Sequence, residues 1–290
     1  PRLTWEYGAK LDVEYSRYDG DLSDALEAIE KGGYSKAVLV HHFGAPRMRQ
    51  EAIKQIDTSI SSEQRESVIK EIEIQLKSQL QEFNKWGCEI ADGYPQLVPF
   101  INADPWVLSG DENVDHIRDM VDNYGAKGIK LHPVAQQFTM SDEAMYPIYN
   151  SCIELDIPIV AHTGPSQVGG ASAEPETFAS VLETFPDLRV VLAHMGGGTW
   201  EQCLEIAERY PNAYFDCCEI MEWIGAPNAP THEQFGHLIK EIGPERVLLG
   251  SDFPWYDLSR SVDLVMSIPL LDIEEKQYIL GANALRIFRL

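Results

Sequence analysis

The sequence predicts a single (β/α)₈ barrel, and two observations carry this prediction. Short apolar runs with the composition of buried strands alternate with amphipathic helical segments, a pattern typical of a parallel sheet covered by helices. Five of these runs also end in histidine or aspartate, at positions 41–42, 132, 162, 194 and 252. A buried strand gains nothing from a polar end unless that group has a partner or a task. In a barrel, this carboxyl end of the strands carries the active site.

The elements follow from local patterns, taken in order. A helix is expected over 21–31, where an apolar face is followed by two glycines that end it. The strand signals, each a short apolar run, cover 37–40, 97–102, 128–131, 157–161, 190–193, 213–217 and 247–250. The other helices are expected over 63–85, 113–124, 142–155, 176–184, 200–210, 232–242, 257–266 and 273–288. Residues 43–85 are an insertion, polar over 47–61 and helical afterwards.

The first strand of the barrel is expected to be truncated or absent from this chain. A closed barrel needs eight strands, and the missing one should precede Asp21, where only 2–7 and 11–15 offer suitable residues. The alternative is a doubly wound open sheet, which would usually show a glycine-rich first turn; no G-x-G-x-x-G occurs. Residues 1–290 are predicted to form one domain, because no linker or composition break interrupts them.

Composition argues against several partners. The net charge of −23 disfavours nucleic acid, because phosphate binding needs a basic surface. The apolar runs are too short for a membrane span. The five cysteines are odd in number and show no C-x-x-C spacing, so we expect reduced, mostly buried thiols in a cytoplasmic protein.

Three strand ends carry the residue types of a metal-dependent active site. His162 is expected to face the barrel axis, and His194 is expected to face it together with Leu192, because side chains alternate along a strand. Gly250 leaves room for the Asp252 carboxylate to reach a central ion. Imidazole nitrogens and carboxylate oxygens are usual ligands of catalytic Zn²⁺, which activates water or polarises a carbonyl.

Four motifs in the carboxyl-terminal two thirds resemble the amidohydrolase-related family, also called amidohydrolase family 2. They follow the family's order and spacing within 97–290, and read VAHTG at 160–164, LAHMGG at 192–197, LGSDFPW at 249–255 and GANALRIF at 281–288. Together they are specific, although each alone is weak. The family consists of (β/α)₈ barrels that act as metal-dependent hydrolases or non-oxidative decarboxylases.

The resemblance implies a role for each strand-end residue. His162 and Asp252 would hold one divalent ion, foremost Zn²⁺, and His194 would polarise or protonate substrate. The family also has a His-x-His at the end of its first strand, which this sequence does not contain. Either the chain was cut just after that motif or the protein lacks it, and two ligands alone are too few for tight Zn²⁺ binding. A carbamylated Lys130 bridging two metals is disfavoured, because the members it resembles have one metal.

Further residues are expected to face the substrate. His132 would bind a carboxylate or acyl oxygen, or instead cap its strand by bonding backbone. His41 and His42 are adjacent, so only one can face the axis, and His42 is the candidate. Arg47 would clamp a carboxylate unless it is a solvated loop residue. Trp255 would wall the pocket or anchor its loop.

Three hypotheses about function follow. In the main one, the protein is a metal-dependent hydrolase of a lactone, ester or amide-like bond; Asp252 takes a proton from metal-activated water and His194 stabilises the carbonyl oxygen. The alternative is a non-oxidative decarboxylase of an aromatic or unsaturated carboxylic acid, with Asp252 protonating the substrate carbon. The third is a catalytically impaired relative. The expected partner is a small carboxylate or lactone substrate. The insertion at 43–85 is expected to shape either a lid over the pocket or a subunit contact. A subunit contact would imply a homodimer.

Overall fold

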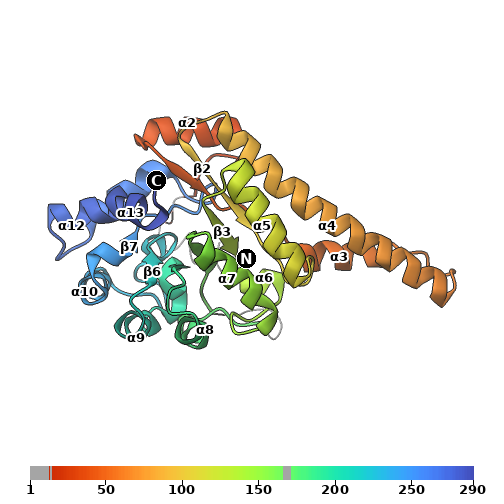
Figure 1. The fold of residues 1–290 in the computed structure, drawn as a ribbon. Helices are drawn as coiled ribbons and strands as arrows, with labels where there is room; N and C mark the ends of the chain where they lie inside the picture. The colour runs from red at the N-terminus through yellow and green to blue at the C-terminus, as the bar shows by residue number, and fades with distance from the viewer. Residues whose placement is uncertain (1–12, 14, 166–170) are drawn as a thin grey trace.

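A curled parallel sheet forms the centre of the molecule. The computed structural model describes residues 13, 15–165 and 171–290 (Figure 1). In this part of the chain each of seven strands pairs in parallel with the next. The strands are β1 (Ala37–Leu39), β2 (Leu97–Asn102), β3 (Gly128–Leu131), β4 (Ile159–His162), β5 (Val190–Ala193), β6 (Ala213–Asp216) and β7 (Val247–Leu248). The predicted parallel sheet is confirmed; most of the region expected to hold the first barrel strand lies outside the described residues.

Helices cover the outer face of this sheet (Figure 1). The α-helices are α2 (Leu22–Gly32), α3 (Ala45–Lys54), α4 (Ser62–Asp92), α5 (Gly110–Tyr124), α6 (Pro133–Gln136), α7 (Tyr146–Glu154), α8 (Ala179–Thr184), α9 (Gln202–Arg209), α10 (His232–Ile242), α11 (Leu258–Ser267), α12 (Ile273–Gln277) and α13 (Asn283–Phe288). Short 3₁₀ segments cover Glu143–Met145, Pro175–Phe178, His194–Thr199, Ile220–Trp223 and Pro244–Arg246, and a π segment covers Tyr278–Ala282. Side-chain caps begin several helices; Ser109, for example, accepts a hydrogen bond from the backbone of Glu112 at the start of α5.

The sheet divides the apolar core into an outer and an inner layer. On β5, Leu192 belongs to the outer cluster beneath the helices, whereas Val191 and Ala193 belong to the inner cluster. Phe288 of α13 meets Phe100 of the inner cluster with ring centroids 5.2 Å apart. The expectation that Leu192 faces the axis is therefore wrong. The strand alternation ends at Ala193, and the next residue turns with a positive φ.

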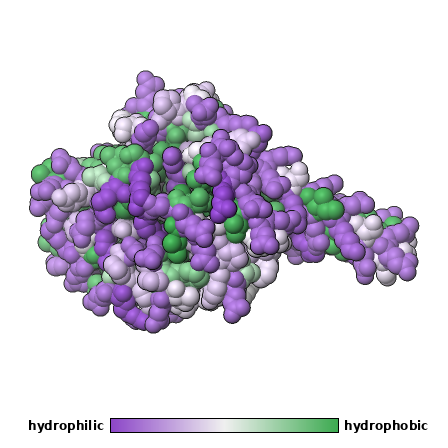
Figure 2. Space-filling view, in the orientation of Figure 1, coloured by the Kyte–Doolittle hydropathy of each residue, from purple (hydrophilic) through white to green (hydrophobic). Residues whose placement is uncertain are grey.

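The insertion forms an arm rather than a polar loop followed by a helix. Helix α3 occupies much of the stretch expected to be polar, and α4 continues seven residues beyond the expected end at 85, to Asp92. The added residues are held inward, because Gly87, Cys88 and Ala91 are buried. The distal part of α3 and α4 projects away from the sheet (Figure 1), and its surface is mainly hydrophilic with a small hydrophobic group (Figure 2).

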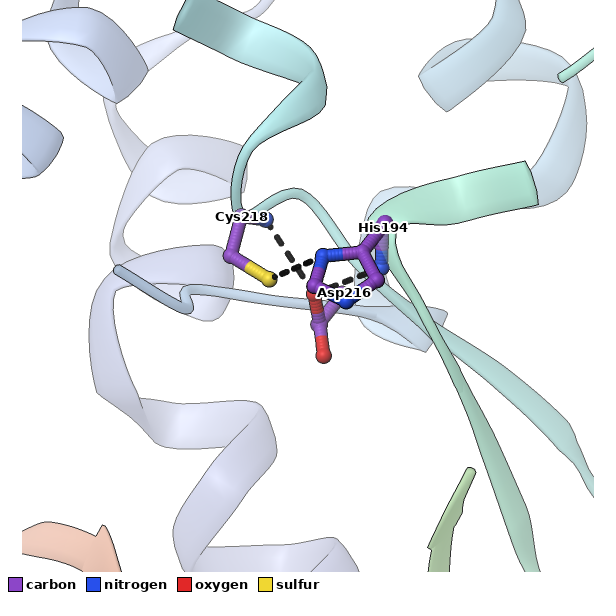
Figure 3. Close-up of side chains that lie close together, drawn as sticks. All are labelled: His194, Asp216 and Cys218. Atoms are coloured by element: carbon purple, nitrogen blue, oxygen red, sulfur yellow. Dashed lines mark hydrogen bonds between the residues drawn. The ribbon is translucent and has the colours of Figure 1, made fainter. Parts of the chain in front are cut away.

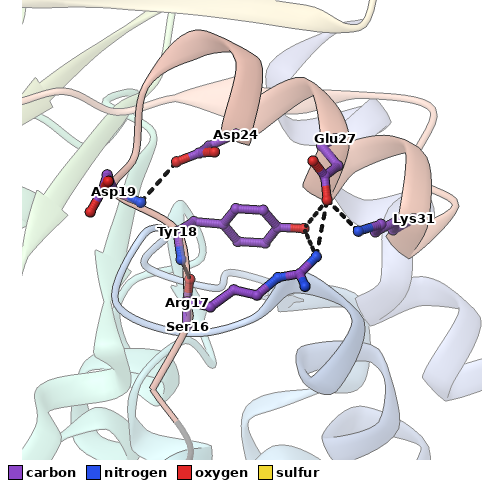
Figure 4. Close-up of polar contacts among 7 residues, drawn as sticks. All are labelled: Ser16, Arg17, Tyr18, Asp19, Asp24, Glu27 and Lys31. Atoms are coloured by element: carbon purple, nitrogen blue, oxygen red, sulfur yellow. Dashed lines mark hydrogen bonds and ion pairs between the residues drawn. The ribbon is translucent and has the colours of Figure 1, made fainter.

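An amino-terminal segment ties α2 to the loop after β7. Glu27 of α2 accepts hydrogen bonds from Arg17, Tyr18 and Lys31, and the backbone N–H of Asp19 donates to Asp24 (Figure 4). The backbone N–H of Ser16 donates to the carbonyl of Trp255, and the ring of Tyr15 stacks on Tyr256 with centroids 5.7 Å apart. This segment therefore holds the loop that carries one of the predicted site residues.

The described helices include no candidate membrane span. Within residues 13, 15–165 and 171–290, none combines the length and the apolar character that crossing a bilayer requires.

Candidate functional site

The carboxyl ends of the strands bring most of the predicted residues to one edge of the sheet. His132 follows β3, His162 ends β4, His194 follows β5, and Asp252 lies four residues beyond β7. Asp216, which the sequence analysis did not single out, ends β6 between them. Since neighbouring parallel strands end on the same side, these side chains converge.

Four imidazole rings form a continuous row along this edge. The ring centroids of His42 and His132 are 5.1 Å apart, and those of His132 and His162 are stacked at 4.0 Å. His194 meets His162 edge to face at 4.9 Å. Burial, with the positive charge of Lys130 adding to its effect, lowers the pKa of His162 to about 2 and that of His194 to about 3. All four rings are therefore neutral at neutral pH.

Carboxyl groups gather opposite these rings. Burial raises the pKa values of Asp216 and Asp252, and it raises that of Glu219 to about 7, with the charges of the two aspartates adding to the effect. Lys130 is 8% exposed and makes no hydrogen bond with any described residue. Burial lowers the pKa of its ammonium group, and the nearby charges of Asp216 and Asp252 oppose that change. The site thus combines one buried amine with three carboxyl groups.

One aspartate organises the backbone around the site. Oδ1 of Asp216 accepts hydrogen bonds from the backbone N–H of His194 at 3.0 Å and from that of Cys218 at 3.1 Å (Figure 3). The ring Nδ1 of His194 lies 3.0 Å from Sγ of Cys218 and 3.4 Å from Oε2 of Glu219. Gly250 is required beside them, because a Cβ there would lie 2.7 Å from Cβ of Cys218. The sequence analysis expected Gly250 to leave room for Asp252, and in the structure it makes room for Cys218.

Backbone strain concentrates at the same edge. His194, Glu219 and Asp252 have φ values of 66°, 59° and 54°, in the left-handed region that non-glycine residues rarely adopt. Such residues cost on the order of 1–3 kcal/mol each and cluster at functional sites. Three consecutive strands therefore each place one strained polar residue at this edge.

The predicted substrate-facing residues differ in where they lie. His132 joins the imidazole row. Its Nδ1 also accepts a weak 3.4 Å hydrogen bond from the backbone N–H of Ala135 and so caps the start of α6. Of the two roles considered for His132, the structure shows a bond to backbone, at a helix start, and substrate binding stays a prediction. His42 joins the row, whereas the His41 ring packs edge-on against Phe83 of α4 at 4.5 Å.

Arg47 and Trp255 lie farther from the row. Arg47 is on α3 with its side chain 84% exposed, and its guanidinium donates to Glu51 at 2.8 Å. The structure does not bring Arg47 together with the other candidates, because the arm is helical where a loop was expected. Trp255 is 55% exposed, and its backbone N–H donates to the carbonyl of Asp252.

Sequence reasoning missed three residues of the site. All three lie at or just after the end of β6: Asp216, Cys218 and Glu219. Like the five strand ends that were singled out, this one is an apolar run that closes with a polar residue. The strand was expected to continue to residue 217, which hid the aspartate inside it. Ending that strand at its first charged residue would have found Asp216.

Two side chains have the character of free metal ligands. Neither the His162 ring nor the Asp252 carboxylate makes a hydrogen bond or ion pair with any described residue, although both are half-buried. A neutral imidazole and a carboxylate with available lone pairs suit zinc or manganese, and the strained φ of Asp252 points to a constrained role. These two residues therefore suit two positions of a divalent-ion site, and tight Zn²⁺ binding would need further ligands.

Sequence comparisons agree with this architecture. The family model described as amidohydrolase matches residues 19–290. A curated relative, the 2-amino-3-carboxymuconate-6-semialdehyde decarboxylase of Dictyostelium discoideum, is 24% identical over 212 residues. That match covers 62% of this chain and 58% of the relative, so the chain spans less than two thirds of the relative's length.

Solved structures share the fold at low sequence identity. An uncharacterized TIM-barrel protein from Bordetella bronchiseptica matches with a TM-score of 0.70 and 21% identity, covering 100% of this chain and 90% of that one. The 5-carboxyvanillate decarboxylase of Novosphingobium aromaticivorans, solved with manganese, matches with a TM-score of 0.65 and 15% identity, covering 92% of this chain and 79% of that one. The predicted barrel class is thereby confirmed.

The main expectation about the reaction needs correction. The sequence analysis put hydrolysis first and decarboxylation second. The curated relative is a decarboxylase, and this overturns the hydrolase hypothesis as the first choice.

Proposed function

The chain belongs to the amidohydrolase family, and from that premise we propose that it catalyses the non-oxidative decarboxylation of a small aromatic or unsaturated carboxylic acid. The observation that carries this proposal is the convergence of Lys130, His162, His194 and Asp252 at one edge of the sheet. The decarboxylase relative supports the choice of reaction.

We propose that one divalent ion binds at this edge, held by His162 and Asp252. Zinc is the ion expected from the sequence, and the manganese in a similar structure makes manganese the second candidate. When bound, such an ion would polarise the substrate carboxylate and an adjacent oxygen. The neutral state of His162 favours this role, because a protonated imidazole has no lone pair to donate.

Lys130 would attract the substrate carboxylate. Its ammonium is buried, and it has no hydrogen bond to a described residue that an incoming anion would have to displace. In its protonated form this desolvated amine attracts a carboxylate more strongly than it would in water. His194 and the other neutral rings add no repulsion toward a neutral unsaturated carbon skeleton.

The reaction also requires a proton. When the bond between the carbon skeleton and its carboxylate breaks, the electron pair stays on carbon, CO₂ leaves, and the carbon takes up a proton. Asp252 is the proposed donor: burial raises its pKa, so the carboxylate that would bind the ion can also take up a proton and pass it to the carbon. Burial also raises the pKa of the nearby Glu219 to about 7, which gives this edge a second carboxyl group able to carry a proton.

A CO₂-release assay tests the proposal. The purified chain, supplied with Zn²⁺ or Mn²⁺, is offered 2-amino-3-carboxymuconate semialdehyde, 5-carboxyvanillate and 2,6-dihydroxybenzoate, and CO₂ is measured. We expect release from at least one of these acids, and loss of release in His162→Ala and Asp252→Asn variants that keep their circular dichroism spectra. Metal analysis of the same samples should find one ion per chain.

Two results would count against the proposal. Equal CO₂ release from wild type and Asp252→Asn would exclude Asp252 as the donor. Absence of release from all three acids, together with no bound metal, would favour a relative that has kept the barrel and lost catalysis.

A further inference from the structure

A thiol lies against the imidazole that faces the site. Nδ1 of His194 is 3.0 Å from Sγ of Cys218, and both side chains are buried (Figure 3). A donor nitrogen and a sulfur at this separation form a hydrogen bond. The two residues are far apart in the sequence and meet because β5 and β6 are neighbours in the sheet. Neither motif analysis nor the family match assigns a task to Cys218.

The surroundings decide which atom donates. Burial raises the pKa of the Cys218 thiol well above its ordinary value, so the sulfur keeps its proton. The Asp216 carboxylate lies beside that thiol, and hydrogen bonding from the thiol lowers the pKa of the carboxylate. A carboxylate is a stronger acceptor than a neutral imidazole, so the thiol proton points to Asp216. The sulfur lone pairs are then left facing Nδ1.

The ring proton must therefore be on Nδ1. His194 is neutral and carries one ring proton, and its Nδ1 faces the sulfur of Cys218 at 3.0 Å, with Oε2 of Glu219 farther away at 3.4 Å and able to accept once it is ionised. The other ring nitrogen, Nε2, makes no hydrogen bond with a described residue. The acceptor on this side fixes the tautomer, as a carboxylate does in many histidine sites.

We propose that Cys218 is a positioning residue. Its sulfur accepts a hydrogen bond from Nδ1 of His194, and its thiol donates a hydrogen bond to Asp216. Nε2 of His194 is then unprotonated on the side of the reaction site. Its effect on rate rests on the proposed decarboxylase function, but the tautomer is a property of the resting protein. The arrangement is a histidine–aspartate pair with a thiol between its members. Gly250 permits it, because any side chain there would displace Cys218.

Metal ligation is the competing explanation of the same three residues. His194, Asp216 and Cys218 present a nitrogen, an oxygen and a sulfur within 4.8 Å of one another. The hydrogen-bonded arrangement is favoured, because Oδ1 of Asp216 already accepts hydrogen bonds from two backbone N–H groups and Nδ1 of His194 already lies 3.0 Å from the thiol sulfur.

Nitrogen NMR of the ¹⁵N-histidine-labelled, metal-free protein tests the tautomer directly. The His194 signals are assigned by their loss in His194→Gln. We expect a protonated Nδ1 and an unprotonated Nε2 in wild type, a shift toward the other tautomer in Cys218→Ala, and the wild-type pattern in Cys218→Ser, whose hydroxyl keeps both roles. Cys217→Ala is the matched control, because its thiol donates instead to the carbonyl of Leu248.

Two further measurements separate the outcomes. If the chain is active, Cys218→Ala should lower kcat roughly 10- to 100-fold with little change in KM, and Cys218→Ser should restore most of it. A proton on Nε2 in wild type, or an unchanged tautomer in Cys218→Ala, would overturn the proposal, whatever the activity. So would a thiolate-to-cobalt absorption band in Co²⁺-treated protein that Cys218→Ser abolishes, since the thiol would then be a metal ligand.

Discussion

The two halves of the carboxyl edge hold their polar groups by different means. Along β1–β4, the histidine half consists of His42, His132 and His162, which contact one another through their rings at 5.1 and 4.0 Å. Along β6 and β7, the acid half consists of Asp216, Glu219 and Asp252 with the thiol of Cys218, and backbone N–H groups bind its central carboxylate. His194 joins the two halves through its ring and its backbone.

This difference separates proton donors from bases. Burial keeps the histidine half unprotonated, because charging an imidazole there would cost solvation and meet Lys130. The same burial raises the carboxyl pKa values of Glu219 and Asp252, whereas Asp216 accepts hydrogen bonds from two backbone N–H groups. A substrate at this edge thus lies between groups that can ligate and groups that can donate protons. The predictions that follow perturb one half at a time.

The largest effect is expected in the acid half, from Asp252→Asn. The amide keeps the size of the side chain but cannot donate a carboxylic proton and is a poorer metal ligand. We expect kcat/KM for CO₂ release to fall by about 1000-fold, equivalent to about 4 kcal/mol. The thermal unfolding midpoint serves as the control for folding. Activity within tenfold of wild type would move the proton donor elsewhere in the acid half.

A smaller effect is expected in the histidine half, from His162→Ala. Removing a ligand without a hydrogen-bond partner should weaken binding of Zn²⁺ or Mn²⁺ by about 100-fold, or about 3 kcal/mol. Competition with a chelator of known affinity measures the change. His132→Ala is the matched control, because it removes the stacked neighbour and leaves the ligand. Equal losses in the two variants would mean that the row of rings, and not His162 alone, binds the ion.

Glu219→Gln tests whether Glu219 of the acid half keeps its proton in the folded protein. An unfolded glutamate loses its proton near its ordinary pKa, whereas folded Glu219 keeps its proton up to about pH 7. Between these values the folded state binds more protons, so its free energy of unfolding decreases as the pH rises to about 7. In the Glu219→Gln variant, this group cannot titrate and does not lower the free energy of unfolding as the pH rises. Its stability relative to wild type should therefore increase between pH 5 and pH 8.

The size of that change is modest because the Glu219 side chain is 35% exposed. Solvent screens part of the burial effect, and we expect about 1 kcal/mol, measured by urea unfolding of the metal-free protein at both pH values. A relative stability that falls with rising pH would show that Glu219 is ionised in the folded state. The acid half would then hold fewer protons than the comparison assumes.

The histidine half was more predictable from sequence than the acid half. His132 and His162 close apolar runs of strand length, so their place at the carboxyl edge follows from period and composition alone. The acid half depends on backbone turns. Glu219 enters the site through a left-handed φ, and Asp216 contacts His194 only because two strands are adjacent. Alternation along a strand does not reveal such turns, which is also why Leu192 was assigned to the wrong face.

The smallest effect is expected outside both halves, from Arg47→Ala. The sequence allowed this arginine to clamp a substrate carboxylate, whereas the structure pairs it with Glu51 one turn along the exposed face of α3. An exposed pair of this kind contributes about 0.5 kcal/mol or less, so stability and kcat/KM should both stay within about twofold of wild type. A tenfold rise in KM at unchanged kcat would instead mean that α3 bends toward the carboxyl edge when substrate binds. The positive charge that meets the carboxylate would then be shared between Lys130 and the arm, and the two halves would no longer account for the site by themselves.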